Sequence, residues 1–191
     1  MSFTFITGGA RSGKSTLALK LAEKRARRPE SVAFVATAVG GDGEMTERIR
    51  KHREDRPAEW TTYEEPFAAA ATVRRAVMER HDVVIVDCVT LLVSNWLCRE
   101  PEDKSLTDER AEATLSEVQA LAGVAAECHA HTIVVTNEVG MGIVPLNGLA
   151  RRYRDVAGTA NQILAAAADT AYLCASGIPV LIKGDAGGDP R

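Results

Sequence analysis

Residues 8–15 have the composition and spacing of a phosphate-binding loop. They read Gly8-Gly9-Ala10-Arg11-Ser12-Gly13-Lys14-Ser15 and fit the pattern G-x-x-x-x-G-K-[ST]. Glycines allow a tight turn that points backbone N–H groups at phosphate oxygens, and the following helix adds its positive N-terminus. Lys14 would then reach the β- and γ-phosphates, and the Ser15 hydroxyl would bind Mg²⁺. The alternative is a glycine-rich turn that contains Gly-Lys-Ser by chance, and a predicted strand before it and helix after it disfavour this alternative.

A carboxylate suited to the same metal follows a second apolar run. Asp87 comes directly after Val83-Val84-Ile85-Val86, a pattern typical of a strand buried on both faces. Proteins with a phosphate-binding loop need an acid near Mg²⁺, normally at the end of such a strand. The alternative is that Asp87 only caps the next helix. The two motifs together predict a site for a nucleoside triphosphate and Mg²⁺.

A basic segment places one histidine, His52, among five cations in residues 48–56. Helical spacing puts Met45, Ile49 and His52 on one face, which we expect to be the inward one. Nearby cations disfavour protonation of the imidazole, and the neutral ring has a nitrogen that could attack phosphorus. From these residues alone, the favoured alternative is a solvated basic helix with a half-buried histidine.

Residues 137–145 form a second candidate loop, followed by Arg151, Arg152 and Arg154. They come after a predicted strand, and loops at the carboxyl ends of parallel strands form the ligand crevice of such sheets. Gly140 and Gly142 would permit close approach of a ligand to the backbone. A substrate loop and an ordinary strand-to-helix connection with a basic first turn both fit this pattern.

Short β-branched runs alternate with alanine-rich helical stretches, which indicates an α/β fold with a mainly parallel sheet. We predict a single domain over residues 1–183 and a disordered tail over residues 184–191. The predicted strands are 3–7, 32–36, 83–87, 132–136, 170–174 and 179–182, the last two forming an antiparallel pair. The predicted helices are 14–27, 44–56, 67–80, 107–126 and 148–168, with a polar loop over 100–106.

The composition limits the kinds of partner and environment that we expect for the protein. The chain has 191 residues, with 23 Lys and Arg against 26 Asp and Glu and a net charge of −3. This balance disfavours a protein that coats nucleic acid. Four scattered cysteines indicate small buried side chains rather than a zinc site or a disulfide framework. Without a basic leader or an apolar run long enough for a bilayer, we expect a cytoplasmic protein with no membrane span.

Several motifs together resemble the bifunctional adenosylcobinamide kinase/adenosylcobinamide-phosphate guanylyltransferase family of cobalamin biosynthesis. The resemblance covers nearly the whole chain. Its most specific part is Asn137-Glu138-Val139-Gly140-Met141-Gly142-Ile143-Val144-Pro145. The other matching motifs are residues 7–15, Ala36-Thr37, Glu44-Met45, Arg48-Ile49 with His52, Arg56-Pro57, Trp60-Thr61, residues 87–91, residues 150–155, Gly158 and Asn161-Gln162.

The resemblance implies two reactions and a P-loop NTPase-type fold. A kinase step would pass the γ-phosphate of ATP or GTP to the hydroxyl of adenosylcobinamide, with Lys14 catalytic and with Ser15 and Asp87 holding Mg²⁺. A guanylyltransferase step would form a covalent guanylyl-histidine on His52. The resemblance also implies nucleotide contacts by Thr37, Arg53, Glu54, Asp55, Arg56 and Glu64, and a ring-like homo-oligomer such as a trimer.

The chain departs from the family pattern after Val144-Pro145, where Leu146 stands in place of a usual glutamate. If that carboxylate contacts the corrinoid, binding would be weaker here. If it only caps the next helix, Asn147 can replace it. Two rival functions also fit the motifs: a P-loop small-molecule kinase without nucleotidyl transfer, and a nucleotide-dependent switch ATPase.

Overall fold

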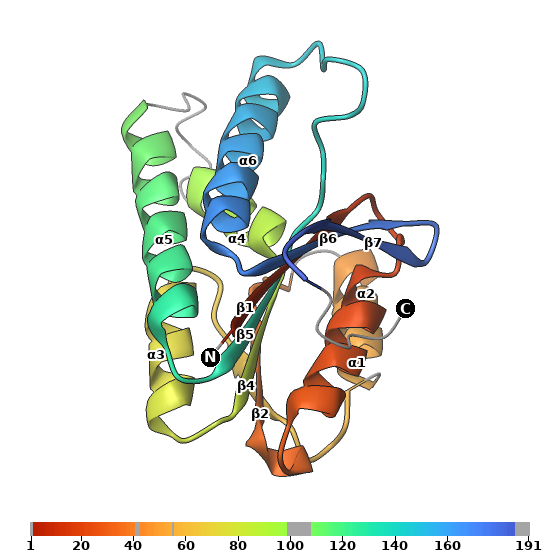
Figure 1. Cartoon of the computed structure of the whole chain (residues 1–191). Helices are drawn as coiled ribbons and strands as arrows, with labels where there is room; N and C mark the ends of the chain where they lie inside the picture. Colours follow the sequence, from red (N-terminus) through yellow and green to blue (C-terminus); the bar gives the residue numbers. More distant parts are fainter. Residues whose placement is uncertain (1, 41–42, 55, 99–107, 186–191) are drawn as a thin grey trace.

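The protein is an α/β sandwich built on one seven-stranded sheet, as the computed structural model shows for residues 2–40, 43–54, 56–98 and 108–185 (Figure 1). The strand order is β3-β2-β4-β5-β1-β6-β7. All neighbouring pairs are parallel except β6 and β7, which pair antiparallel. The strands are β1 (Ser2–Gly8), β2 (Val32–Ala36), β3 (Thr61–Glu64), β4 (Val83–Asp87), β5 (His131–Val135), β6 (Thr170–Ala175) and β7 (Ile178–Lys183).

Helices cover both faces of this sheet (Figure 1). They are α1 (Lys14–Arg25), α2 (Gly43–Glu54), α3 (Ala69–Met78), α4 (Val89–Leu97), α5 (Asp108–Glu127) and α6 (Gly148–Ala167), with a 3-10 turn at Pro29–Ser31. One core cluster joins the sheet to α3, α4, α5 and α6. The other joins it to α1.

The central strands explain why their sequences are apolar without interruption. Along β1, Phe3 and Phe5 belong to the cluster under α3 to α6, whereas Ile6 belongs to the cluster under α1. In β4, Val84 faces the first cluster and Ile85 the second. Because side chains alternate between the two faces of a strand, a strand covered by helices on both sides needs an apolar residue at every position.

The predicted class, a mainly parallel sheet flanked by helices with a C-terminal antiparallel pair, is confirmed. The predicted limits of β2 and β4 match the structure, and the other predicted elements differ by one to two residues at an end. Two elements were missed. The strand β3 is only four residues long and half exposed, and α4 is only nine residues long, so both are too short to show a clear periodicity.

The prediction that the four cysteines are buried is confirmed only in part. Cys88 and Cys174 are buried and Cys128 is partly buried, but the prediction was wrong for Cys98, which is exposed at the end of α4.

The single domain over 1–183 and the tail from 184 stay predictions, and residues 186–191 and 100–106 lie outside the described part of the chain. No helix among the described residues is long and apolar enough to span a membrane.

Candidate nucleotide-binding site

A cavity of about 270 Å³ lies where the carboxyl ends of β1, β2, β4 and β5 meet. It brings together residues from distant parts of the sequence. Nine of the residues predicted for the site line this cavity: Arg11, Ser12, Gly13, Lys14, Ser15, Arg53, Arg56, Glu64 and Asp87. Ile49, Cys88, Leu91 and Asn137 also line it. The cavity therefore has two walls, the phosphate-binding loop with the end of β4 on one side and α2 with the end of β3 on the other.

The loop between β1 and α1 depends on glycine at two positions. Gly8 has φ 151°, and a Cβ there would lie 2.3 Å from the carbonyl oxygen of Cys174. Gly13, the residue before α1, has φ 94°, and a Cβ there would lie 3.0 Å from the Cα of Gly177. Any other residue at these positions would combine backbone strain with a steric clash. These contacts explain why the motif needs both glycines. Gly9 and Ala10 lie between them on the same loop.

The turn between β6 and β7 supports this loop from outside. Gly177 N–H donates a hydrogen bond to the Ser12 carbonyl at 3.0 Å. Ser176 and Gly177 have φ values of 53° and 83°, as two-residue hairpin turns require. The sequence signal for the turn is Ser-Gly between two predicted strands, but nothing in the sequence indicates that the turn contacts the phosphate-binding loop. Gly177 is thus a positioning residue that sequence reasoning missed.

Lys14 and Ser15 lie at the start of α1 with their polar groups already held. Lys14 is only 7% exposed, and its Nζ donates to the Gly9 carbonyl at 2.5 Å and contacts Ser12 Oγ at 3.4 Å. The ammonium is therefore folded over the loop that would bind phosphate. Ser15 Oγ donates to Asp87 Oδ2 at 2.8 Å, a contact between residues 72 positions apart.

The Ser15 and Asp87 oxygens fit Mg²⁺. Two neighbouring oxygens of an octahedral Mg²⁺ with bonds of 2.0–2.1 Å lie about 2.9 Å apart, close to the observed 2.8 Å. The described residues contain no group of three or more His, Cys, Asp or Glu that could hold a metal. Mg²⁺ does not need one, since it commonly binds through one or two protein oxygens, phosphates and water. Asp87 does not cap α4, whose N-cap is Cys88.

Thr37 fixes the backbone that carries Asp87. Its buried hydroxyl donates to the Cys88 carbonyl at 2.7 Å and accepts from Cys88 N–H at 2.9 Å. Thr37 N–H also donates to the Asp87 carbonyl at 3.2 Å. The predicted contact of Thr37 with nucleotide stays a prediction. Burial, with the Asp87 charge, raises the pKa of the Cys88 thiol to about 11, so this thiol is neutral at physiological pH.

The second wall presents two arginines to the cavity. Arg53 forms an ion pair with Glu64 at the end of β3. The guanidinium carbon of Arg56 lies 3.6 Å from the centre of the Phe34 ring, an attractive cation–π geometry. Burial lowers the pKa of Arg56 to about 10, and its buried Nη1 has no hydrogen-bond partner among the described residues. Arg56 is therefore charged, partly desolvated and incompletely paired, as expected for a group that binds an anion.

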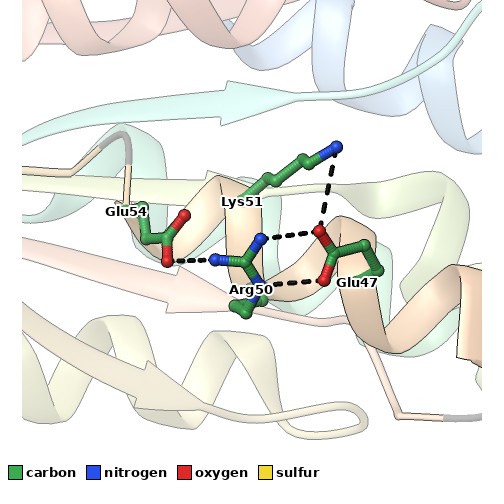
Figure 2. A network of polar contacts seen from close by, with 4 residues as sticks. All are labelled: Glu47, Arg50, Lys51 and Glu54. Atoms are coloured by element: carbon green, nitrogen blue, oxygen red, sulfur yellow. Dashed lines mark hydrogen bonds and ion pairs between the residues drawn. The ribbon is translucent and has the colours of Figure 1, made fainter.

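The outer part of α2 carries an ion-pair network (Figure 2). Arg50 donates to both Glu47 oxygens, at 2.8 and 2.6 Å, and is ion-paired with Glu54. Lys51 lies 3.8 Å from Glu47. The hydrogen bond from Arg50 lowers the pKa of Glu47. Glu54, predicted to contact nucleotide, is thus occupied by Arg50 and is not among the described residues that line the cavity, so its nucleotide contact stays a prediction.

His52 belongs to α2, between the cavity-lining residues Ile49 and Arg53 in the sequence. The side chains of His52 and Met45 lie outside the described part of the chain, and so does Asp55. Of the three residues predicted to share the inward face, Ile49 is the one whose side chain the structure describes, and it lines the cavity. The roles predicted for His52 and Asp55 therefore stay predictions.

The connection from β5 to α6, residues 136–147, begins at the cavity with Asn137. Arg154 donates to the carbonyls of Gly140 and Gly142, at 2.5 and 3.2 Å. Arg151 donates to those of Pro145 and Leu146, at 3.0 and 2.6 Å. Asn147 Oδ1 accepts from Leu149 N–H at 2.8 Å, which confirms that Asn147 can cap the helix. Two arginines from the first two turns of α6 thus fix the loop that precedes this helix.

The loop between β1 and α1, the Ser15–Asp87 pair and the sheet define a P-loop nucleotide-binding protein of the α/β class. Comparison with known proteins narrows this class. The chain belongs to the cobinamide kinase / cobinamide phosphate guanyltransferase family, whose CobU model matches residues 4–182.

Two relatives of similar length support this membership. The chain is 43% identical over 181 residues to the bifunctional adenosylcobalamin biosynthesis protein CobP of Pseudomonas aeruginosa, covering 94% of this chain and 96% of the relative. It is 42% identical over 183 residues to CobU of Escherichia coli, covering 93% and 98%. Among solved structures, a KaiC-like protein of Pyrococcus horikoshii is similar with a TM-score of 0.48 and 15% identity, covering 90% of this chain and 70% of that one.

Proposed function

We propose that this protein is a bifunctional enzyme of cobalamin biosynthesis that phosphorylates adenosylcobinamide and then transfers GMP from GTP to the product. Family membership is the basis of the proposal. The observation that carries it chemically is the cavity, because one space is lined by a phosphate-binding loop, a Ser15–Asp87 oxygen pair and the two arginines of the opposite wall. Anion-binding groups on both walls suit reactions in which a polyphosphate meets a second substrate.

In the kinase step, the hydroxyl of adenosylcobinamide attacks the γ-phosphorus of ATP or GTP, and the bond to the β-phosphate oxygen breaks. Phosphoryl transfer depends chiefly on positioning and charge stabilisation. Backbone N–H groups of residues 8–13 and the Lys14 ammonium supply both. Lys14 would exchange its bonds to Gly9 and Ser12 for the phosphates. Ser15 and Asp87 would hold Mg²⁺, which neutralises phosphate charge when bound.

In the guanylyltransferase step, a His52 ring nitrogen attacks the α-phosphorus of GTP and pyrophosphate leaves. A phosphate oxygen of adenosylcobinamide phosphate then attacks the same phosphorus, the P–N bond breaks, and adenosylcobinamide-GDP forms. A covalent intermediate divides one difficult displacement into two easier ones. Arg53 and Arg56, which follow His52 in the sequence, line the cavity, where their charge would stabilise the phosphates under attack.

Glu64 is the candidate for recognising guanine. Its carboxylate is exposed at the end of β3 and paired with Arg53. A carboxylate can accept hydrogen bonds from N1–H and the exocyclic amine of guanine, which adenine does not offer in that arrangement. We further propose that the enzyme acts as a homo-oligomer, such as a trimer. Because both reactions consume nucleoside triphosphates, we expect it in the cytoplasm.

The guanylyl-histidine can be tested by incubating the protein with α-labelled GTP. We expect a protein adduct that is stable in alkali and labile in acid, as a phosphoramidate is, and that is lost in His52→Ala. The matched control is His129→Ala, since His129 is an exposed histidine at the opposite end of the sheet, before β5. An undiminished adduct in His52→Ala would remove His52 from the mechanism. No adduct in the wild-type protein would instead favour a kinase without nucleotidyl transfer.

A further inference from the structure

Residues 137–149 expose an unusual run of apolar side chains. Met141 is 80% exposed, Ile143 96%, Val144 62%, Leu146 99% and Leu149 45%. Contiguous exposed apolar residues on a folded protein commonly mark a binding surface. Figure 1 shows this segment rising from the end of β5 to the start of α6, away from the body of the sheet. We call residues 137–149 the apolar loop.

The apolar loop has a fixed conformation despite its exposure. Arg151 and Arg154 hold four of its carbonyls, and Glu138 Oε1 accepts from Gly140 N–H at 2.6 Å. Asn147 caps α6, whose first two residues, Gly148 and Leu149, complete the apolar loop. Because these bonds are made by the free chain, a ligand that binds the exposed side chains need not order the backbone first, which lowers the entropic cost of binding.

The apolar loop is continuous with the nucleotide cavity. Asn137, its first residue, lines that cavity, and Glu138 N–H donates to the Gly8 carbonyl of the phosphate-binding loop at 3.0 Å. Met141 is four residues beyond Asn137, so its Cα lies at most about 14 Å from that of Asn137. A substrate whose reacting group enters the cavity here can extend over the apolar loop.

We propose that the apolar loop is the docking surface for the corrin ring of adenosylcobinamide, through Met141, Ile143 and Val144. The proposal rests on the proposed function. The cavity of about 270 Å³ is small beside a nucleotide and a corrinoid together. The corrin ring would therefore extend beyond the cavity, with the hydroxyl arm reaching the phosphates, and the methyl groups of the ring suit apolar side chains.

Gly142 adds to the fit. Nothing lies within 4 Å of the position that a Cβ would take on Gly142, and this residue stands between Met141 and Ile143. A large, rigid ring can therefore approach the backbone between two apolar side chains. Apolar contact also explains how Leu146 can stand where the family usually has glutamate, because Leu146 extends the same apolar surface.

The test compares steady-state kinetics of Met141→Ser, Ile143→Ser and the double variant with those of the wild-type protein. We expect the KM for adenosylcobinamide to rise about tenfold in each single variant and about a hundredfold in the double variant, as for loss of one or two buried apolar side chains. The KM for ATP and the GTP adduct, which needs no corrinoid, should not change. Met78→Ser is the matched control, because Met78 is 77% exposed on α3.

An unchanged KM for adenosylcobinamide in the double variant would overturn the docking surface while leaving the proposed function intact. A smaller assembly by sedimentation velocity, with the KM values for both substrates raised in parallel, would also overturn it and would assign the apolar loop to contacts with a second copy of the chain. A wild-type protein that does not phosphorylate adenosylcobinamide would instead refute the proposed function. Thermal unfolding of each variant checks that folding is intact.

Discussion

The two walls of the cavity are built in opposite ways. The phosphate-binding loop and Asp87 sit at the ends of buried strands, and their polar groups bond to one another and to the backbone around them. The α2 wall is a helix whose outer side carries exposed ion pairs, with Arg53 55% exposed at the cavity. Exposed pairs contribute little to stability, so the ion pairs described on α2 fix their side of the cavity less firmly than packing fixes the first wall.

This difference fits the two reactions proposed for the site. Triphosphate binding needs donors whose geometry is set in advance, and the first wall provides them through Gly8, Gly13 and the support of Gly177. A wall that takes part in a covalent intermediate must meet GTP, the guanylyl group and then a second phosphate. A helix whose described polar contacts are exposed ion pairs can adjust to each of these at small cost.

The largest effect should come from the first wall, at Lys14. Lys14→Ala removes the ammonium that we propose neutralises the transferred phosphoryl group, and we expect kcat/KM of the kinase step to fall about a thousandfold. Lys20→Ala, an exposed lysine on the same helix, should leave the rate unchanged. Retained phosphorylation of adenosylcobinamide by Lys14→Ala would refute the assignment of the phosphate-binding loop.

The rigidity of the first wall can be measured at Gly13. In Gly13→Ala a Cβ must fit 3.0 Å from the Gly177 Cα at φ 94°, and we expect the free energy of unfolding to fall by about 2–3 kcal/mol. Urea unfolding measures this loss. The control, Gly123→Ala in α5, meets nothing within 4 Å and should stabilise the protein by about 0.5–1 kcal/mol. Equal effects of the two variants would argue against a tightly packed loop.

On the second wall, Arg56 should matter for binding but not for stability. Arg56→Met removes a partly desolvated guanidinium whose Nη1 lacks a partner among the described residues. We expect GTP to bind about tenfold more weakly because a charge-assisted bond to phosphate is lost. The unfolding midpoint should change little, because the variant loses the cation–π contact with Phe34 but also removes a partly buried charge that is incompletely paired. A lower midpoint with unchanged GTP affinity would make Arg56 a structural residue.

The smallest effect should come from the ion pairs on the outer side of α2. Glu47→Gln should change the unfolding temperature by no more than about 1 °C at pH 7, and less at high salt. Because the pKa of Glu47 is lowered from 4.5, its contribution is present above that pH and is lost as the pH falls through the lowered pKa. The difference in unfolding temperature between wild type and variant should therefore shrink steadily as the pH is lowered from 7 to 2. A large change at pH 7 would mean that α2 is as firmly fixed as the first wall.

The same contrast explains what could be predicted from the sequence. The first wall is made by local motifs on strands buried on both faces, so Lys14, Ser15 and Asp87 could be identified and their convergence expected. The second wall depends on β3, whose short, half-exposed sequence has no clear period. Contacts between distant segments, such as Gly177 with Ser12, leave no pattern in either segment alone.

The role of the basic residues was the other feature that could be predicted only in part. The arginines of α6 were expected near the loop after β5, with a substrate role left open. In the structure Arg151 and Arg154 hold loop carbonyls, and Arg152 pairs with Asp108. A guanidinium donates strong hydrogen bonds to any nearby oxygen. A basic cluster in a sequence therefore does not by itself distinguish a phosphate-binding site from arginines that fix a loop through its backbone carbonyls.

The central claim, that one cavity serves both phosphoryl and guanylyl transfer, is tested most directly by incubating the protein with adenosylcobinamide, ATP and GTP and following both corrinoid products over time. We predict that adenosylcobinamide phosphate appears first and adenosylcobinamide-GDP follows, and that GTP added without ATP still yields both. Accumulation of the phosphate alone, with GTP present in excess, would contradict the account.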